Sequence, residues 1–196
     1  MAFLGRHAVL GFGLSMAVPL IPLYYVRDLG ASDAWIGLIG TTQAALTMSG
    51  YFLWRRIARR RSGGNWVLLL STSGIAAFPA ILGFTRNEIA IAVLVGVYGI
   101  CLAGIELAIF DELMKAIPAN QATRFAALDQ GASNFAGMTA PIAGALVAGA
   151  LGIPAGLMVA GGVTAAGAAL FAAAVLTHRR AASADAPASP DTAPGG

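Results

Sequence analysis

The chain has 196 residues, of which 58% are hydrophobic and only 11% are charged, and its mean hydropathy is +0.76. Soluble domains carry about 25% charged residues, so this composition excludes an ordinary soluble domain and favours a surface covered mainly by lipid. The pI of about 9.5 would suggest nucleic acid in a soluble protein, but the basic residues are few and clustered, so we expect no nucleic-acid partner.

Six apolar runs follow one another along the chain, and each is about as long as the ~20 residues that a helix needs to cross a bilayer. Period-two alternation is absent, which argues against a membrane barrel. We therefore predict an all-α membrane protein with six transmembrane helices, spanning residues 8–26, 35–54, 65–84, 89–110, 125–151 and 153–177.

The flanking segments complete this predicted organisation. Residues 1–7 form a short N-terminus, residues 8–178 the bundle, and residues 179–196, rich in Pro, Ala and Ser, a disordered tail. A signal peptide is the alternative for the first run, but the apolar stretch continues past the small residues at 15–17. Ser32 is a predicted N-cap for the second helix.

Basic residues predict the orientation of the bundle. If the loop between the second and third helices is cytoplasmic, ten of the twelve Lys and Arg residues lie on the cytoplasmic side. This asymmetry follows the positive-inside rule and places both termini in the cytoplasm of a cell-membrane protein. Half of those ten form a basic loop that should also attract anionic lipid headgroups: Arg55, Arg56, Arg59, Arg60 and Arg61.

Three stretches resemble the major facilitator superfamily (MFS) of transporters. "PLIPLYYVRDLGASDAWIGLI" (19–39) is similar to the first-helix and second-helix entry of a half transporter. "GYFLWRRIARRRSGGNWVLLL" (50–70), a stretch that begins at Gly50, lies where the family has its loop signature. "GMTAPIAG" (137–144) resembles the fifth-helix pattern. The resemblance covers about residues 8–178, six of the family's usual twelve helices.

Departures from the loop signature indicate which half is present. Arg55 stands where the signature begins with glycine, Arg59 where it has an acidic residue, and Ser62 where it has a later glycine. In the family that acidic residue belongs to a charge relay that steadies one conformation, which cannot operate in that form here. Such loss is more usual in the second half, so the chain resembles a C-terminal half most.

The fifth run carries a face of polar and small residues. Its members are spaced four, three, four and three positions apart, which places them on one side of a helix: Gln130, Asn134, Gly137, Pro141 and Gly144. Such a face suits a helix that lines a substrate cavity, and equally a helix that packs closely on another. Pro141 removes one backbone hydrogen bond and would permit a bend.

Glu106 and Gln43 are two further polar residues that lie inside predicted spans. A carboxylate there is costly and should face protein or water, so Glu106 is a candidate for the substrate pathway and for proton binding. The alternative is a structural hydrogen bond, or an ion pair with Arg124 or Arg56. The amide of Gln43 needs a partner on another helix or on a substrate.

The resemblance thus implies an MFS-type secondary transporter that moves a small solute of unknown identity by alternating access. Enzyme activity, cofactors and metals are not expected, because both histidines lie at membrane edges and Cys101 is alone. Six helices amount to half a transporter, so a second half is expected as a partner, from the same gene, from a second copy, or from a separate chain. The alternative function is a non-transporting assembly or binding subunit.

Overall fold

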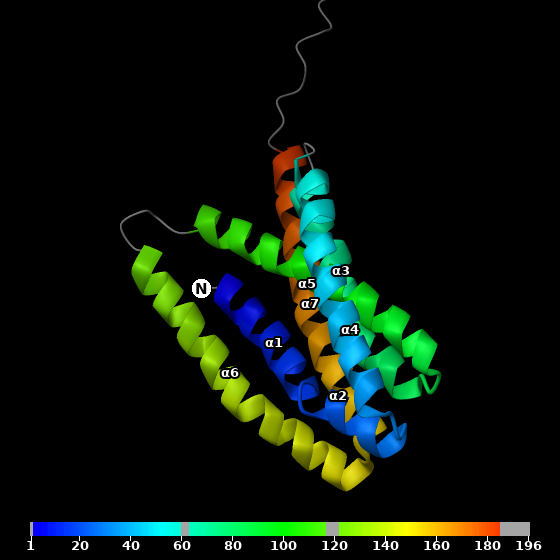
Figure 1. The fold of residues 1–196 in the computed structure, drawn as a ribbon. Helices are drawn as coiled ribbons and strands as arrows, with labels where there is room; N and C mark the ends of the chain where they lie inside the picture. Colours follow the sequence, from blue (N-terminus) through cyan, green and yellow to red (C-terminus); the bar gives the residue numbers. More distant parts are fainter. Residues whose placement is uncertain (1, 60–62, 117–121, 185–196) are drawn as a thin grey trace, which may run out of the picture.

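The computed structural model describes residues 2–59, 63–116 and 122–184, and these residues are almost entirely helical. Six long helices and two short segments follow in chain order (Figure 1): α1 Ala2–Ala17, α2 Leu20–Leu23, the π-helical turn η1 Tyr24–Asp28, α3 Asp33–Ala58, α4 Gly63–Phe84, α5 Glu88–Ala116, α6 Ala122–Leu151 and α7 Ile153–Ala184. The expected all-α architecture is confirmed.

Five helical segments are long and apolar enough to cross a membrane: Gly5–Asp28, Trp66–Phe84, Glu88–Asp111, Gln130–Leu151 and Ile153–Ala174. They correspond to five of the six predicted spans. The remaining one, predicted at 35–54, is the helix α3, which is long enough but falls outside this group because polar residues interrupt its apolar run. The chain is therefore a multi-pass helical membrane protein.

The first predicted helix is not continuous. Its N-terminal part begins by Ala2, so residues 2–7 are helical and do not form a separate segment. The helix α1 ends at Ala17, and the chain resumes as α2 and η1 after Pro19. Proline lacks the amide hydrogen that would bond the preceding turn, which explains a break at this position.

Local signals account for several helix ends. The Ser32 hydroxyl accepts a bond from the Trp35 amide (3.4 Å), which confirms the N-cap of α3. Asn87 Oδ1 accepts the amides of Ile89 (3.0 Å) and Ala90 (3.1 Å) at the start of α5. Gly152 has φ +91°, a left-handed conformation that favours glycine and lets α7 follow α6 directly.

The C-terminal boundary differs from the prediction. The helix α7 continues to Ala184, so the tail predicted from residue 179 begins as helix. Alanine has the highest helix propensity of any residue, and the segment "RRAASA" contains three alanines. Residues 185–196 lie outside the described part of the chain.

Helix contacts define the order in which the long helices are packed. The helix α1 contacts α6 and α7, α4 contacts α7 and α5, and α3 packs most extensively on α5. The packing order is thus α6, α1, α7, α4, α5, α3, with α6 and α3 at its two ends. Figure 1 shows α6 at one side of the bundle. Each terminal helix keeps a large surface that the other described helices leave uncovered.

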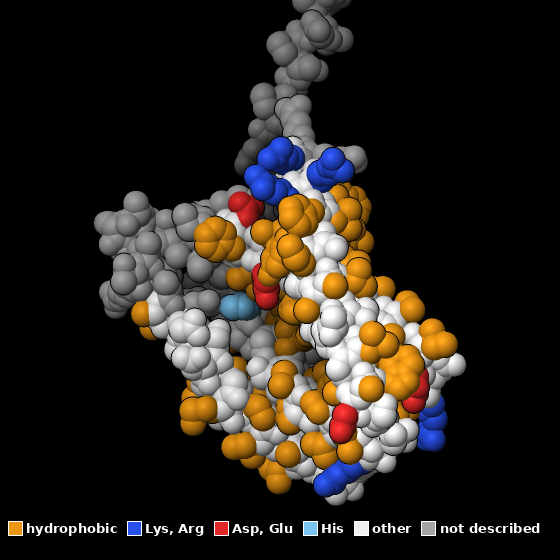
Figure 2. Space-filling model, in the orientation of Figure 1, with side chains coloured by type: hydrophobic (Ala, Val, Ile, Leu, Met, Phe, Trp, Pro, Cys, Tyr) orange, Lys and Arg blue, Asp and Glu red, His pale blue; other side chains and the backbone are white. Residues whose placement is uncertain are grey.

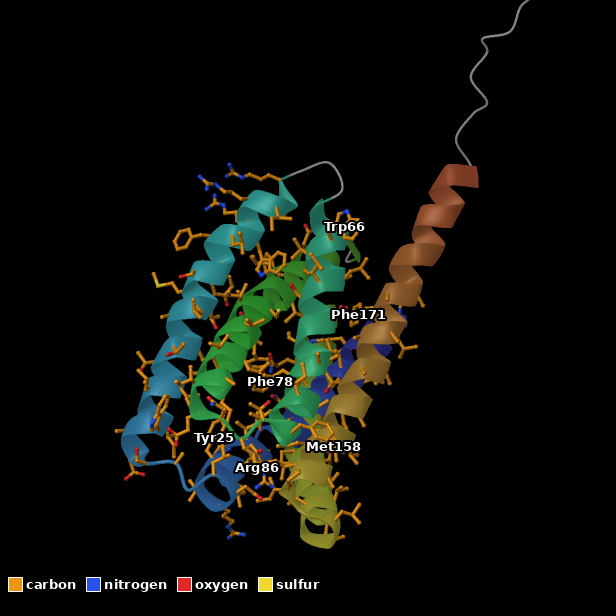
Figure 3. The ribbon with its side chains drawn as sticks, turned by 90° about the vertical axis from the view of Figure 1, so that its right-hand side faces the viewer. Tyr25, Trp66, Phe78, Arg86, Met158 and Phe171 are labelled. Atoms are coloured by element: carbon orange, nitrogen blue, oxygen red, sulfur yellow. The ribbon has the colours of Figure 1, made fainter. Side chains whose placement is uncertain are left out.

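The buried residues form two clusters at different heights. One includes Phe171, which Figure 3 shows between α4 and α7, together with Trp54. The other includes Tyr25 and Phe78, and the ring of Phe78 stacks on Tyr98 with centroids 4.2 Å apart. Trp54 lies in the cluster nearer the end that bears Arg55, Arg56 and Arg59, which we call the arginine end.

Candidate functional site

A strip of small and polar side chains runs along one face of α3. Gly40, Gln43, Thr47 and Tyr51 are spaced three or four positions apart, and with Ala44 and Met48 they line an open groove of about 480 Å³. We call this face the polar strip. It contains Gln43, which was predicted from the sequence as a candidate site residue. It also contains two hydroxyl groups that can donate hydrogen bonds, those of Thr47 and Tyr51.

Close packing on α5 positions this strip. A Cβ atom added to Gly99 would lie 2.7 Å from the Gln43 carbonyl oxygen and 2.8 Å from Thr47 Oγ1. A Cβ atom added to Gly50 would lie 3.0 Å from the Cβ of Ala103 and from the Cα of Ile100. Glycines on both helices therefore let the two backbones approach, as small residues do in membrane proteins. This contact explains why Gln43 and Thr47 are only half-buried at the edge of the interface.

Glu106 lies beside the polar strip. The Tyr51 hydroxyl donates a hydrogen bond to Glu106 Oε2, across 55 positions of sequence. Both side chains are exposed, so the pair lies on the surface of the bundle. Gly99 and Ala103, which precede Glu106 by about two turns and one turn of α5, are buried against α3, whereas Phe110, one turn after it, is exposed.

The partner of Glu106 differs from the ion pairs considered from the sequence. Tyr51 holds the carboxylate, rather than Arg56, while the side chain of Arg124 lies outside the described residues. Sequence reasoning missed Tyr51 because an aromatic residue near a membrane edge is usually an interfacial anchor. Its spacing was the available signal, since Tyr51 follows Thr47 by four positions and Gln43 by eight.

The face predicted on α6 divides into two parts. Gln130, Asn134 and Gly137 are exposed, and Gln130 Nε2 donates to Asn134 Oδ1 (3.1 Å). Gly144 is buried, and a Cβ atom added to it would lie 2.4 Å from the carbonyl oxygen of Met16 on α1. Pro141, which lies between these parts, is half-buried and does not interrupt α6. The close-packing alternative therefore applies to Gly144, whereas Gln130, Asn134 and Gly137 remain exposed.

The space-filling view relates the two terminal helices. Figure 2 shows the molecule hollowed between α6 on the left and α3 on the right, with acidic and histidine side chains visible in the hollow. Only 17% of the span Gln130–Leu151 is buried, compared with 39–50% of the other four apolar spans. The helix α6 thus touches the bundle along little of its surface.

Charged side chains occupy the ends of the helices. Arg55, Arg56 and Arg59 are exposed at one end of α3, where Figure 2 shows basic side chains gathered. Arg60 and Arg61 lie outside the described residues. Arg27 and Arg86 are exposed at the other end of the bundle. Among the residues that the structure describes, His, Cys, Asp and Glu form no group that could hold a metal ion.

Comparison with known proteins gives one family match. The family model described as Major Facilitator Superfamily matches residues 7–194. Curated proteins gave no significant match. The family match begins within α1 and covers the other long helices completely. It agrees with the resemblance carried by residues 19–39, 50–70 and 137–144.

Proposed function

Because the chain belongs to the major facilitator superfamily, whose model matches residues 7–194, we propose that it acts as one six-helix half of a secondary transporter. Members of this family are membrane transporters. In such proteins the substrate is held near the middle of the membrane, between two halves that rock against each other. The chain would then move a small solute by alternating access, together with a second half.

The observation that carries this proposal is the hydrogen bond between Tyr51 and Glu106 beside the polar strip. Carboxylates and amides within a membrane are costly to expose to lipid, and they commonly mark a substrate or ion pathway. Gln43 and Glu106 lie on neighbouring helices, α3 and α5, that pack closely together. Glu106 is exposed and Gln43 is half-buried beside it, which supports a wall of a water-filled pathway in which both side chains meet solute.

The helix α6 supplies a second candidate wall. Its exposed pair, Gln130 and Asn134, can offer amide donors and acceptors to a solute. Gly137 leaves open space beside it, because nothing lies within 4 Å of a Cβ atom added there. Gly50 and Gly144, by contrast, would act by letting helices approach, and Pro141 by weakening one turn of α6.

The second half would cover the polar strip of α3 and the exposed polar face of α6. A lone half would expose polar groups to lipid, which has no hydrogen bonds to offer them. The partner would come from the same gene, from a second copy of this chain, or from a separate chain. The basic residues support a location in the cell membrane with both termini in the cytoplasm.

Cysteine labelling tests the pathway without knowledge of the substrate. The native Cys101 is buried and free, so Cys101→Ala gives a silent background. In that background Gln43→Cys and Asn134→Cys would be compared with Val93→Cys, whose side chain is 63% exposed in an apolar groove shared with Trp35 and Leu38. The reagent is a membrane-impermeant maleimide, applied to either face of native membranes.

A thiol in water ionises and reacts, whereas a thiol facing lipid does not. We expect labelling of Gln43→Cys and Asn134→Cys at least tenfold faster than labelling of Val93→Cys. Equal rates at all three positions would contradict the pathway and favour the non-transporting assembly or binding subunit. Once a solute is found, Glu106→Gln should lower its flux while the amount of protein in the membrane stays unchanged.

A further inference from the structure

A second groove lies at the arginine end of α3. It has a volume of about 540 Å³ and is lined by residues of the last two turns of α3 and by its C-cap, Arg59. The lining residues are Phe52, Leu53, Arg55, Arg56 and Arg59. Three guanidinium groups therefore lie beside two apolar side chains. The polar strip does not include any of these residues, so this groove is separate from the proposed solute pathway.

Trp54 determines the direction in which the groove opens. Its ring is 6% exposed, and its Nε1 donates to the carbonyl oxygen of Ile100 on α5 (2.7 Å). At about 100° per residue, Phe52, Arg56 and Arg59 lie on the side of α3 opposite Trp54. Because α3 is a terminal helix in the packing order, the described helices leave this side uncovered.

The apolar and the charged side chains of the groove follow one another along the axis of α3. Phe52 is 66% exposed and Leu53 is 48% exposed, and both precede the arginines, on the side towards the membrane interior. Arg56 and Arg59 follow one and two turns later, at the end of the span. A planar guanidinium can donate two parallel hydrogen bonds to one phosphate.

This order matches the order of groups in a phospholipid. We propose that the groove binds an anionic phospholipid, with its phosphate between Arg56 and Arg59 and an acyl chain along Phe52 and Leu53. A soluble anion would use only the arginines, whereas a lipid uses both parts. The site does not depend on the proposed transport activity, because its residues face away from the bundle.

Lipid retention by the purified full-length chain tests this site. Native mass spectrometry in detergent would compare phosphatidylglycerol with phosphatidylcholine carrying the same acyl chains. We expect preferential retention of phosphatidylglycerol. Since a basic residue near an anionic membrane surface contributes about fivefold in affinity, the double variant Arg56→Gln/Arg59→Gln should bind it about 25-fold more weakly.

A matched control removes two charges elsewhere. Arg27→Gln/Arg86→Gln changes the net charge equally at the opposite end of the bundle and should leave phosphatidylglycerol binding within about twofold of the native value. Phe52→Ala should weaken binding while the preference for phosphatidylglycerol over phosphatidylcholine persists. Equal losses in the two double variants would overturn the site, because they would indicate a general charge effect.

Inorganic phosphate separates a lipid site from an anion site. Phosphate at millimolar concentration should neither displace phosphatidylglycerol nor raise the melting temperature of the protein, because it cannot contact Phe52. Displacement by phosphate, together with an unchanged affinity in Phe52→Ala, would overturn the lipid assignment and leave a simple anion site.

Discussion

Trp54 Nε1 donates a hydrogen bond of 2.7 Å to the carbonyl oxygen of Ile100, and this bond joins α3 to α5 at the arginine end. Trp54→Phe keeps an aromatic ring but removes the donor. We expect the free energy of unfolding to fall by about 1 kcal/mol, in the range of hydrogen bonds between membrane helices. Thermal unfolding in detergent measures this change. Phe84→Leu, at a residue that is 74% exposed, should have a smaller effect, and equal losses would argue against a specific role for the bond.

The bond between Tyr51 and Glu106 predicts energetic coupling between α3 and α5. Tyr51→Phe removes the hydroxyl, and Glu106→Gln removes the charge that strengthens the bond. A hydrogen bond to a charged group contributes about 1.5–3 kcal/mol, and exposure of both groups should bring the coupling to about 1 kcal/mol. A double-mutant cycle on the free energy of unfolding measures it. Strict additivity of the two single variants would show that the groups do not interact.

Close approach of α1 and α7 predicts opposite effects at two neighbouring glycines. A Cβ atom added to Gly13 would lie 2.5 Å from the backbone nitrogen of Thr164, whereas one added to Gly11 meets nothing within 4 Å. Gly13→Ala should therefore force the helices apart and cost about 1–3 kcal/mol. Gly11→Ala, on the same helix, should be neutral or stabilising, because alanine favours helix. Similar melting temperatures for both variants would contradict this packing.

The proposal of a second half predicts the size of the native gene product. An antibody against residues 181–196, used on membranes of the source cell, should detect a band of roughly 40 kDa if both halves belong to one polypeptide. A band near 19.8 kDa would exclude fusion to a second half. Cross-linking in the membrane would then be expected to show a dimer, since a stable monomer would have no complete pathway.

Much of the helical organisation could be predicted because it depends on local sequence. Apolar runs of about 20 residues predicted each long helix, and Ser32 predicted the start of α3 through its hydroxyl. The break after Ala17 could also have been predicted, because Pro19 and Pro22 are visible in the sequence. The extension of α7 to Ala184 was missed because the composition suggested a disordered tail, although alanine favours helix.

The candidate site was only partly predictable. Glu106 and Gln43 could be selected as candidates because burying a polar side chain in a membrane span is energetically costly. That cost is evident from the residue and its place in the apolar run, without knowledge of its neighbours. Tyr51 could not be assigned to Glu106 in the same way, because the two are 55 positions apart and lie on different helices. The sequence left open whether the face of α6 lines a cavity or packs on another helix, and only the structure shows that Gly144 meets Met16 while Gly137 meets open space.

By itself the sequence determined that the chain is helical and membrane-embedded, approximately where its helices lie, and where its basic residues gather, because these follow from composition and short-range pattern. Only the tertiary structure decided which helices and side chains contact one another. It shows that α3 packs on α5 and that Tyr51 binds Glu106. It also shows that Trp54 faces α5, so that Phe52, Arg56 and Arg59 face outward. Lipid gives little preference for one arrangement of apolar helices over another. The neighbours are therefore set by close contacts at small residues, such as Gly99 against Thr47, which are visible only when two helices are placed together.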